Sequence, residues 1–154
     1  MVDTPRAELE RTDFATFQPL ADLPMAMTAH VVFSALDPAH PATTSATIIH
    51  QVIRGVIGFQ GLLMSDDVSM NALSGSIAER TRAILAAGCD MVLHCNGKLD
   101  EMREVARETP ELSGKALERA GHALASRKAP QPFDRLKARA ELDALVARAG
   151  TVGA

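Results

Sequence analysis

The chain has 154 residues, of which 47% are hydrophobic and 23% charged, and this balance indicates one folded globular domain and excludes a disordered segment. The net charge is -3 and the charges are mixed in sign along the chain, so there is no basic stripe to attract nucleic acid. No apolar run approaches the roughly 20 residues that cross a bilayer, and the first residues lack an apolar signal region, so a cytoplasmic protein with no membrane partner is expected.

The first half of the chain predicts two strands separated by a helix. A short helix is expected over residues 7–11, and a buried strand over residues 24–33. Apolar residues recur at helical spacing over residues 46–54, which predicts a second helix. A strand over residues 61–64 follows, and then a loop over residues 65–76.

The second half continues the alternation and then changes to helices alone. It predicts a helix over residues 77–87 closed by a glycine, a strand over 90–93 and a helix over 99–108. Two further helices are expected over 112–126 and 133–149, separated by a proline-containing hinge. Strands that alternate with helices predict an α/β fold whose parallel strands are joined by right-handed crossovers.

Two consecutive carboxylates follow the third apolar segment of the chain, in the sequence Ser65-Asp66-Asp67. A loop that begins at the carboxyl end of a parallel strand is a typical edge of an active site. Successive side chains of an extended chain point to opposite faces, so Asp66 and Asp67 cannot both face one substrate atom. One carboxylate is therefore expected to do chemistry and the other to support the loop, and any second catalytic group must come from elsewhere.

Three potential zinc ligands, Cys89, His94 and Cys95, lie around the strand at 90–93. Their spacing matches no common zinc pattern and only three ligands are in view, so neither a metal nor a disulfide is expected.

Several sequence blocks, in this order, resemble the bacterial β-N-acetylhexosaminidases of glycoside hydrolase family 3. The match extends from about Val2 to Ala125, and the order of the blocks makes it specific. The blocks are Met27-Thr28-Ala29-His30-Val31, Asp37-Pro38, Pro41-Ala42-Thr43, Ile53-Arg54, Gly58-Phe59, Ser65-Asp66-Asp67-Val68-Ser69-Met70, Ala87-Gly88-Cys89-Asp90 and Leu93-His94-Cys95-Asn96-Gly97.

This resemblance implies a cofactor-free cytoplasmic hydrolase that removes terminal non-reducing N-acetylglucosamine from peptidoglycan fragments during cell-wall recycling. It implies Asp66 as the nucleophile of a retaining reaction, with Asp67 and Ser65 as loop support. Asp67 is the alternative nucleophile if the assignment is displaced by one residue.

The resemblance also implies part of a (β/α)8 barrel, because about three predicted strands cannot close a barrel that needs eight strands and roughly 250 residues. Residues 1–127 would form the carboxyl-terminal portion of the barrel, with about its last three βα units, and residues 128–154 a helical extension. The family's acid/base histidine loop, Lys-His-(Phe/Ile)-Pro-Gly-His-Gly, is not in this chain, which is similar at Val2-Asp3-Thr4-Pro5 to the stretch that follows that loop. Alone, the chain is expected to be weak or inactive.

Two further residues are candidates for substrate contact. His30 is near a strand end, where its imidazole could contact the sugar, order Asp66 or simply pack, and Met70 could line the pocket. A competing interpretation is a non-catalytic half-barrel that self-associates or docks on a partner through unpaired strand edges. A doubly wound signalling receiver that binds Mg²⁺ through Asp66 and Asp67 fits poorly, since no separate phosphoacceptor aspartate and late lysine follow the required pattern.

Overall fold

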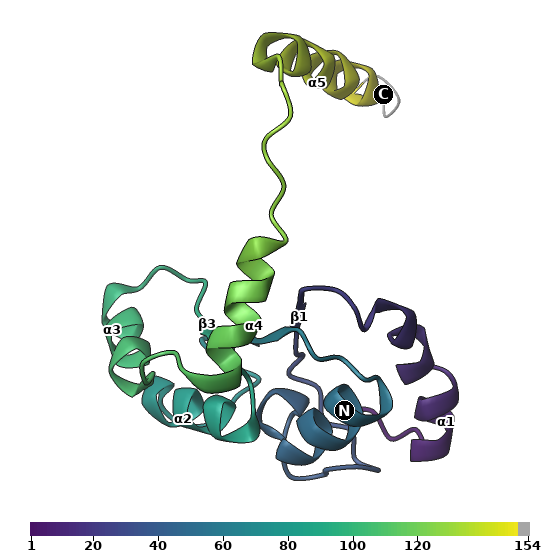
Figure 1. Ribbon diagram of the computed structural model, residues 1–154, viewed down its shortest axis with the longest axis vertical. Coiled ribbons are helices and arrows are strands. Elements are labelled where there is room, and N and C mark those ends of the chain that lie inside the picture. The colour runs from purple at the N-terminus through teal and green to yellow at the C-terminus, as the bar shows by residue number, and fades with distance from the viewer. Residues whose placement is uncertain (151–154) are drawn as a thin grey trace.

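The computed structural model describes residues 1–150 as a small α/β body followed by a separate helix (Figure 1). Its elements are α1 (Arg6–Arg11), η1 (Phe14–Thr16), η2 (Gln18–Leu20), β1 (Met25–Met27), η3 (Ala42–Thr44), η4 (Ile48–Val56), β2 (Leu62–Asp67), α2 (Ile77–Ala87), β3 (Met91–Leu93), α3 (Leu99–Glu108), α4 (Gly114–Ala125) and α5 (Arg135–Gly150).

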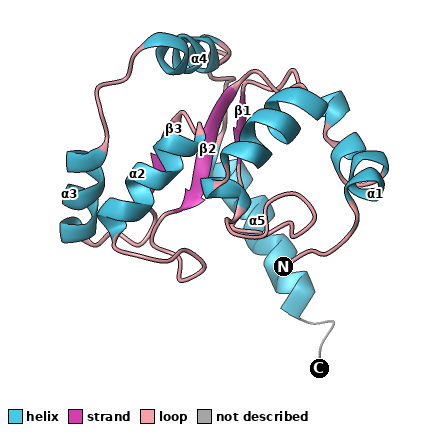
Figure 2. Ribbon diagram, turned by 90° about the horizontal axis from the view of Figure 1, so that it is seen from below, coloured by secondary structure: helices cyan, strands magenta, loops and turns pink. Residues whose placement is uncertain are grey.

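The three strands form one parallel sheet in the order β1-β2-β3, so β2 is central (Figure 2). Met27 pairs with Met64, and Met64 pairs with Met91, which fixes the register across the sheet. Helices connect successive strands, as parallel pairing requires. The α/β class with parallel strands is therefore confirmed.

Two strand predictions were wrong in extent. β1 covers only Met25–Met27 of the predicted 24–33, because beyond Thr28 the chain leaves β2, and the side chains of Thr28 and His30 bond to Thr43 of η3. β2 runs through Asp67 instead of stopping at Met64, so Ser65, Asp66 and Asp67 belong to the strand and not to the following loop.

One face of the sheet packs against the helices. Leu63 is in a buried cluster with Ile49 of η4 and Ile84 of α2, and Ala26 and Val92 pack against the same cluster. The segment predicted as a helix over 46–54 is a π-helix in η4, where the N–H of Ile57 bonds to the carbonyl of Val52, five residues back. α2 matches its prediction, since a Ser76–Glu79 capping box begins it and Gly88, in the left-handed conformation, ends it.

The other face of the sheet carries methionines that are largely open to solvent. Met25, Met27 and Met91 are 49%, 50% and 40% exposed. A groove of about 380 Å³ runs beside β1 and continues this surface over Phe17, Leu20 and Leu23, among other apolar residues. The outer edge of β1 pairs with no strand of the described chain, so the sheet presents an apolar face together with an open edge.

The starts of the strands are held by one buried carboxylate. Asp90 accepts hydrogen bonds from Arg54 at 2.9 Å, from Arg119 of α4 at 2.8 Å and from the backbone N–H of Leu63 at 2.9 Å. Its side chain is 6% exposed, and both guanidinium groups also bond to carbonyls of the η4–β2 connection. This cluster ties η4, β3 and α4 together at the amino end of the sheet.

α5 stands apart from this body, at the end of an extended connection (Figure 1). Several of its apolar side chains are exposed, including Leu136, Leu142 and Leu145. Within residues 1–150, every helix is too short or too polar to cross a bilayer.

Candidate active site

The carboxyl end of β2 contains a bulge at the Ser65-Asp66-Asp67 segment. Met64 pairs with Met91 and Asp67 pairs with Leu93, so three steps along β2 correspond to two along β3. Ser65 is fully buried, and its hydroxyl accepts the N–H of Leu93 at 2.9 Å. The Ser65 hydroxyl thus accepts a hydrogen bond from the backbone of β3 at the bulge. Bulges of this kind re-aim side chains beside active sites.

Asp66 keeps part of its carboxylate available. Its Oδ1 accepts the N–H of Asp67 at 2.8 Å, and Oδ2 receives no hydrogen bond from the described residues. The backbone N–H of Asp66 donates to Thr28 Oγ1 at 3.3 Å. The residue is half-buried, and its backbone N–H and Oδ1 are both held by hydrogen bonds.

The carboxylate of Asp67 is instead fully engaged. Its Oδ1 accepts the backbone N–H groups of Ser69 at 3.0 Å and Cys95 at 3.2 Å, and its Oδ2 accepts the Ser69 hydroxyl at 2.7 Å. Burial acts to raise the pKa of Asp67, but the Ser69 and Cys95 hydrogen bonds outweigh it and lower that pKa. The two carboxylates therefore do not form a mutual acid/base pair.

His30 lies within hydrogen-bond distance of the strand end. Its Nε2 is 2.9 Å from the carbonyl oxygen of Asp67, and its Nδ1 is 2.9 Å from Thr43 Oγ1. Both ring nitrogens are thus engaged by the protein. Met70, the other candidate for substrate contact, is 43% exposed just beyond the strand, and its N–H donates to Asp67 O at 3.1 Å.

The loop after β2 is held by Arg80 of α2. The guanidinium donates to the carbonyls of Val68 and Met70, each at 3.1 Å, and to that of Gly75 at 2.9 Å. The loop after β3 is held similarly by Glu101, which accepts from Asn96 at 2.7 Å. Both loops at the Asp66 edge are therefore ordered by side chains of the helices that follow them.

Three residues of this edge had no role assigned from the sequence, namely Thr28, Thr43 and Ser69. All of them belong to blocks that carry the family resemblance. The side chains of Thr28 and Thr43 bond to partners 13 to 38 residues away, so no local spacing pattern links them to the site. Ser69 is two residues after Asp67, and this local turn spacing was a signal that could have identified it.

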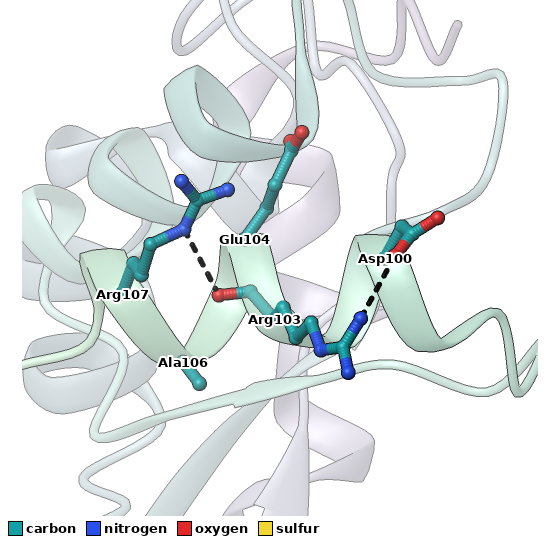
Figure 3. Close-up of a pocket in the computed structure, with 5 residues that line it drawn as sticks. All are labelled: Asp100, Arg103, Glu104, Ala106 and Arg107. Carbon is teal, nitrogen blue, oxygen red and sulfur yellow. Dashed lines mark hydrogen bonds and ion pairs between the residues drawn. The ribbon is translucent and has the colours of Figure 1, made fainter.

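A hollow on the outer surface of α3 is unrelated to this edge (Figure 3). All five residues that line it come from α3. Its charged groups interact locally: Arg103 pairs with Asp100 at 3.2 Å, and Arg107 bonds to the carbonyl of Arg103 (Figure 3). The hollow offers no set of converging catalytic groups, so the carboxyl end of β2 remains the candidate site.

Curated relatives named β-hexosaminidase match more than half of this chain in sequence. The β-hexosaminidase of Alkalilimnicola ehrlichii is 47% identical over 95 residues, which are 59% of this chain and 27% of that protein. The β-hexosaminidase of Neisseria meningitidis serogroup B is 42% identical over 104 residues, 64% of this chain and 28% of that protein. The chain thus spans about a quarter of the length of these relatives.

Solved structures show the same arrangement of elements. Native NagZ from Neisseria gonorrhoeae is 31% identical with a TM-score of 0.69, over 84% of this chain and 36% of that chain. The β-N-acetylglucosaminidase from Thermotoga maritima is 29% identical with a TM-score of 0.67, over 82% of this chain and 31% of that chain. The N-terminal domain model of glycosyl hydrolase family 3 matches residues 1–122, most of the chain, which therefore belongs to this family.

Proposed function

We propose that this chain carries the nucleophile of a retaining β-N-acetylglucosaminidase, and that Asp66 is that nucleophile. The observation that carries the proposal is the contrast between adjacent carboxylates: Asp66 Oδ2 is without a hydrogen bond from the described residues, whereas both oxygens of Asp67 are engaged. A nucleophile needs an available lone pair on an ionised, well-held carboxylate. Asp67 and Ser65 act as supports of the strand end.

The substrate class is proposed from the family. The relatives are named β-hexosaminidase and β-N-acetylglucosaminidase, which supports a terminal N-acetylglucosaminide as substrate. The narrower proposal, supported by the family resemblance, is a peptidoglycan-derived saccharide in cytoplasmic cell-wall recycling, with no cofactor. Met70 is proposed to border the sugar, and His30 to contact it or to order Asp66.

The reaction follows from the carboxylate chemistry. Asp66 Oδ2 attacks the anomeric carbon, and a new carbon–oxygen bond forms as the glycosidic bond breaks and its electron pair passes to the leaving oxygen. Water then attacks the same carbon, the bond to Asp66 breaks with its electron pair returning to the carboxylate, and the proton lost by the water passes to a separate base. The two displacements give net retention of configuration. A half-buried carboxylate with one oxygen free of described hydrogen bonds fits this role, because that oxygen can face the positive charge that develops on the sugar.

Protonation of the leaving group requires a separate acid. Asp67 is held as an acceptor of three hydrogen bonds, and both ring nitrogens of His30 are engaged by the protein. Neither group therefore fits the proton donor without rearrangement. With natural leaving groups we expect this chain alone to be slower by about 10²- to 10⁴-fold than an enzyme with its general acid.

The decisive experiment uses a leaving group that needs no acid. The chain is incubated with a ring-fluorinated N-acetylglucosaminyl fluoride, from which fluoride departs unprotonated while the ring fluorine slows hydrolysis of the adduct. Intact-mass spectrometry should show one added sugar, and peptide mapping should place it on Asp66. Asp66→Asn should remain unlabelled and Asp67→Asn should still be labelled; a label on Asp67 instead would reverse the assignment.

A second candidate function is supported by the open apolar face of the sheet. We propose that residues 1–127 are a portion of a (β/α)8 barrel and that residues 128–150 form a helical extension, while residues 151–154 of the predicted extension lie outside the described residues. We also propose that the β1 edge self-associates or docks on a partner. The exposed methionines and the groove beside β1 support this alternative. A monomer at all concentrations in sedimentation equilibrium would count against self-association.

A further inference from the structure

We propose that Thr28, Thr43 and His30 are positioning residues for Asp66. They form a chain of four hydrogen bonds whose two ends are backbone groups of Asp66 and Asp67. The inference rests on the proposed nucleophile role of Asp66, but the hydrogen-bonded chain itself can be tested without any activity.

The chain of bonds is continuous. The N–H of Asp66 donates to Thr28 Oγ1 at 3.3 Å, and Thr28 Oγ1 is 2.9 Å from Thr43 Oγ1. Thr43 Oγ1 is in turn 2.9 Å from His30 Nδ1, and His30 Nε2 is 2.9 Å from the carbonyl oxygen of Asp67. The groups come from the segment after β1, from η3 and from β2, and the bonds form a ring that closes through the backbone of Asp66 and Asp67.

When the His30 ring is neutral, the direction of each of the four bonds follows from the acceptor at the end of the chain, the carbonyl oxygen of Asp67. A carbonyl oxygen only accepts, so His30 Nε2 must carry a hydrogen. In the neutral ring Nδ1 then accepts from the Thr43 hydroxyl, Thr43 Oγ1 accepts from the Thr28 hydroxyl, and Thr28 Oγ1 accepts from the N–H of Asp66. The neutral Nε2–H tautomer therefore satisfies all four contacts, with each hydroxyl donating once.

Burial makes this arrangement rigid. Thr43 is fully buried and Thr28 is 6% exposed, so water has little access to replace a missing partner. Removing the Thr43 hydroxyl would take away the donor to His30 Nδ1 and the acceptor of the Thr28 hydroxyl at once. The β-branched threonines also have few rotamers, which holds the chain of bonds in one geometry.

The effect on chemistry comes through the backbone of the nucleophile. The four bonds fix the N–H of Asp66 and the C=O of Asp67, while Asp66 Oδ1 bonds the N–H between them. With these groups fixed, the direction of Asp66 Oδ2 is set before substrate arrives. Such preorganisation affects the rate of bond formation more than the affinity for the sugar.

Matched variants exist in η3. Thr43→Val removes the hydroxyl in the chain of bonds, and Thr43→Ser keeps it. Thr44→Val is the control, because its neighbouring hydroxyl bonds only the carbonyl of Pro41, at 3.3 Å. His30→Gln identifies the His30 signals among those of the five histidines.

The first measurement is imidazole nitrogen NMR on the whole chain. We expect His30 as the neutral Nε2–H tautomer, and we expect Thr43→Val to shift its Nδ1 resonance and the Asp66 amide while Thr44→Val moves neither. A His30 ring with its hydrogen on Nδ1 alone, or equal shifts in the two valine variants, would overturn the proposed chain of bonds.

The second measurement is the rate of Asp66 labelling by the fluorinated glycosyl fluoride. Thr43→Val should lower the maximal labelling rate by about 10- to 100-fold with little change in the half-saturating concentration, and Thr43→Ser should restore it. Unchanged maximal rates in Thr43→Val would overturn the positioning role. If the parent chain is not labelled at all, the proposed function fails, whereas the NMR result still decides whether the chain of bonds exists.

Discussion

The carboxylate of Asp67 accepts the backbone N–H of Cys95 at 3.2 Å, so a side chain at the end of β2 holds the first residues beyond β3. The same oxygen accepts the N–H of Ser69 at 3.0 Å. The loops after the two strands are therefore joined through one side chain, and Asp66 lies immediately beside that junction.

Asp67→Asn should destabilise the fold more than Asp66→Asn. The asparagine side chain has no charge and only one acceptor oxygen, whereas the two oxygens of Asp67 accept three hydrogen bonds. We expect this loss to cost about 1–3 kcal/mol of unfolding free energy. Asp66→Asn should change it by less than about 0.5 kcal/mol, since its carboxylate accepts a single described bond. Urea unfolding followed by circular dichroism is the suitable measurement, because the chain has no Trp or Tyr. Equal losses would show that Asp67 has no special supporting role.

The alkylation rate of Cys95 should depend on the charges of Asp66 and Asp67. Its pKa is raised by desolvation and then by the carboxylates of Asp67 and Asp66. Asp67→Asn and Asp66→Asn should each lower that pKa, increase the thiolate fraction and speed alkylation of Cys95 by iodoacetamide at mildly alkaline pH. Buried Cys89, whose pKa burial raises to about 12, should react slowly in every variant and serves as the internal control. If neither substitution changed the alkylation rate of Cys95, the two carboxylates would have no effect on the pKa of its thiol.

The chain should lose stability on acidification, partly through Glu101. Hydrogen bonds from Asn96, His94 and Lys98 lower the pKa of Glu101 from 4.5 to about 2. A lowered folded-state pKa contributes stability above the unfolded value, and this contribution is lost as pH falls from about 4.5 to about 2. Glu101→Gln should therefore show a smaller loss in this window than the parent, measured by urea midpoints. Because Glu101 is at the surface, high salt should reduce the difference between them.

Local patterns predicted the helices well. The residues of α2 and α3 were predicted with their observed ends, since apolar spacing, caps and a terminal glycine are local signals. The observed strand β1 is shorter than the predicted strand at 24–33, because strand length depends on the partner strand and β1 pairs only along Leu62–Met64. The π-helical form of η4 likewise could not be read from a spacing that fits an α-helix equally well.

The candidate site was predicted in part for a similar reason. The Asp66-Asp67 doublet is contiguous, so the sequence marked it directly. The partners that separate the two roles are distant: Thr28 bonds Asp66 across 38 residues and Cys95 bonds Asp67 across 28. Such contacts are set by the parallel order of the strands, which the sequence indicated, and by a bulge in β2, which it did not.

Asp90 should be the most sensitive polar position in the body. Asp90→Ala leaves the guanidinium groups of Arg54 and Arg119 without their shared carboxylate, and their side chains are only 11% and 19% exposed. Breaking a buried charge cluster in this way costs about 3–5 kcal/mol. Asp100→Ala removes an ion pair on the surface of α3 and should have no measurable effect. A small loss at Asp90 would imply that water reaches the two arginines.

A single positive charge on β1 should prevent self-association through the unpaired edge of the sheet. Met25 is 49% exposed at the unpaired edge, and a lysine there would place an ammonium group against the groove lined by Phe17, Leu20 and Leu23. A charge on an exposed edge strand opposes pairing with another chain, so Met25→Lys should remain monomeric at concentrations where the parent forms larger species in sedimentation equilibrium. Leu136→Lys is the matched control, because Leu136 is 85% exposed on α5, away from the sheet. If Leu136→Lys alone abolished association, the contact would belong to α5 and not to the β1 edge.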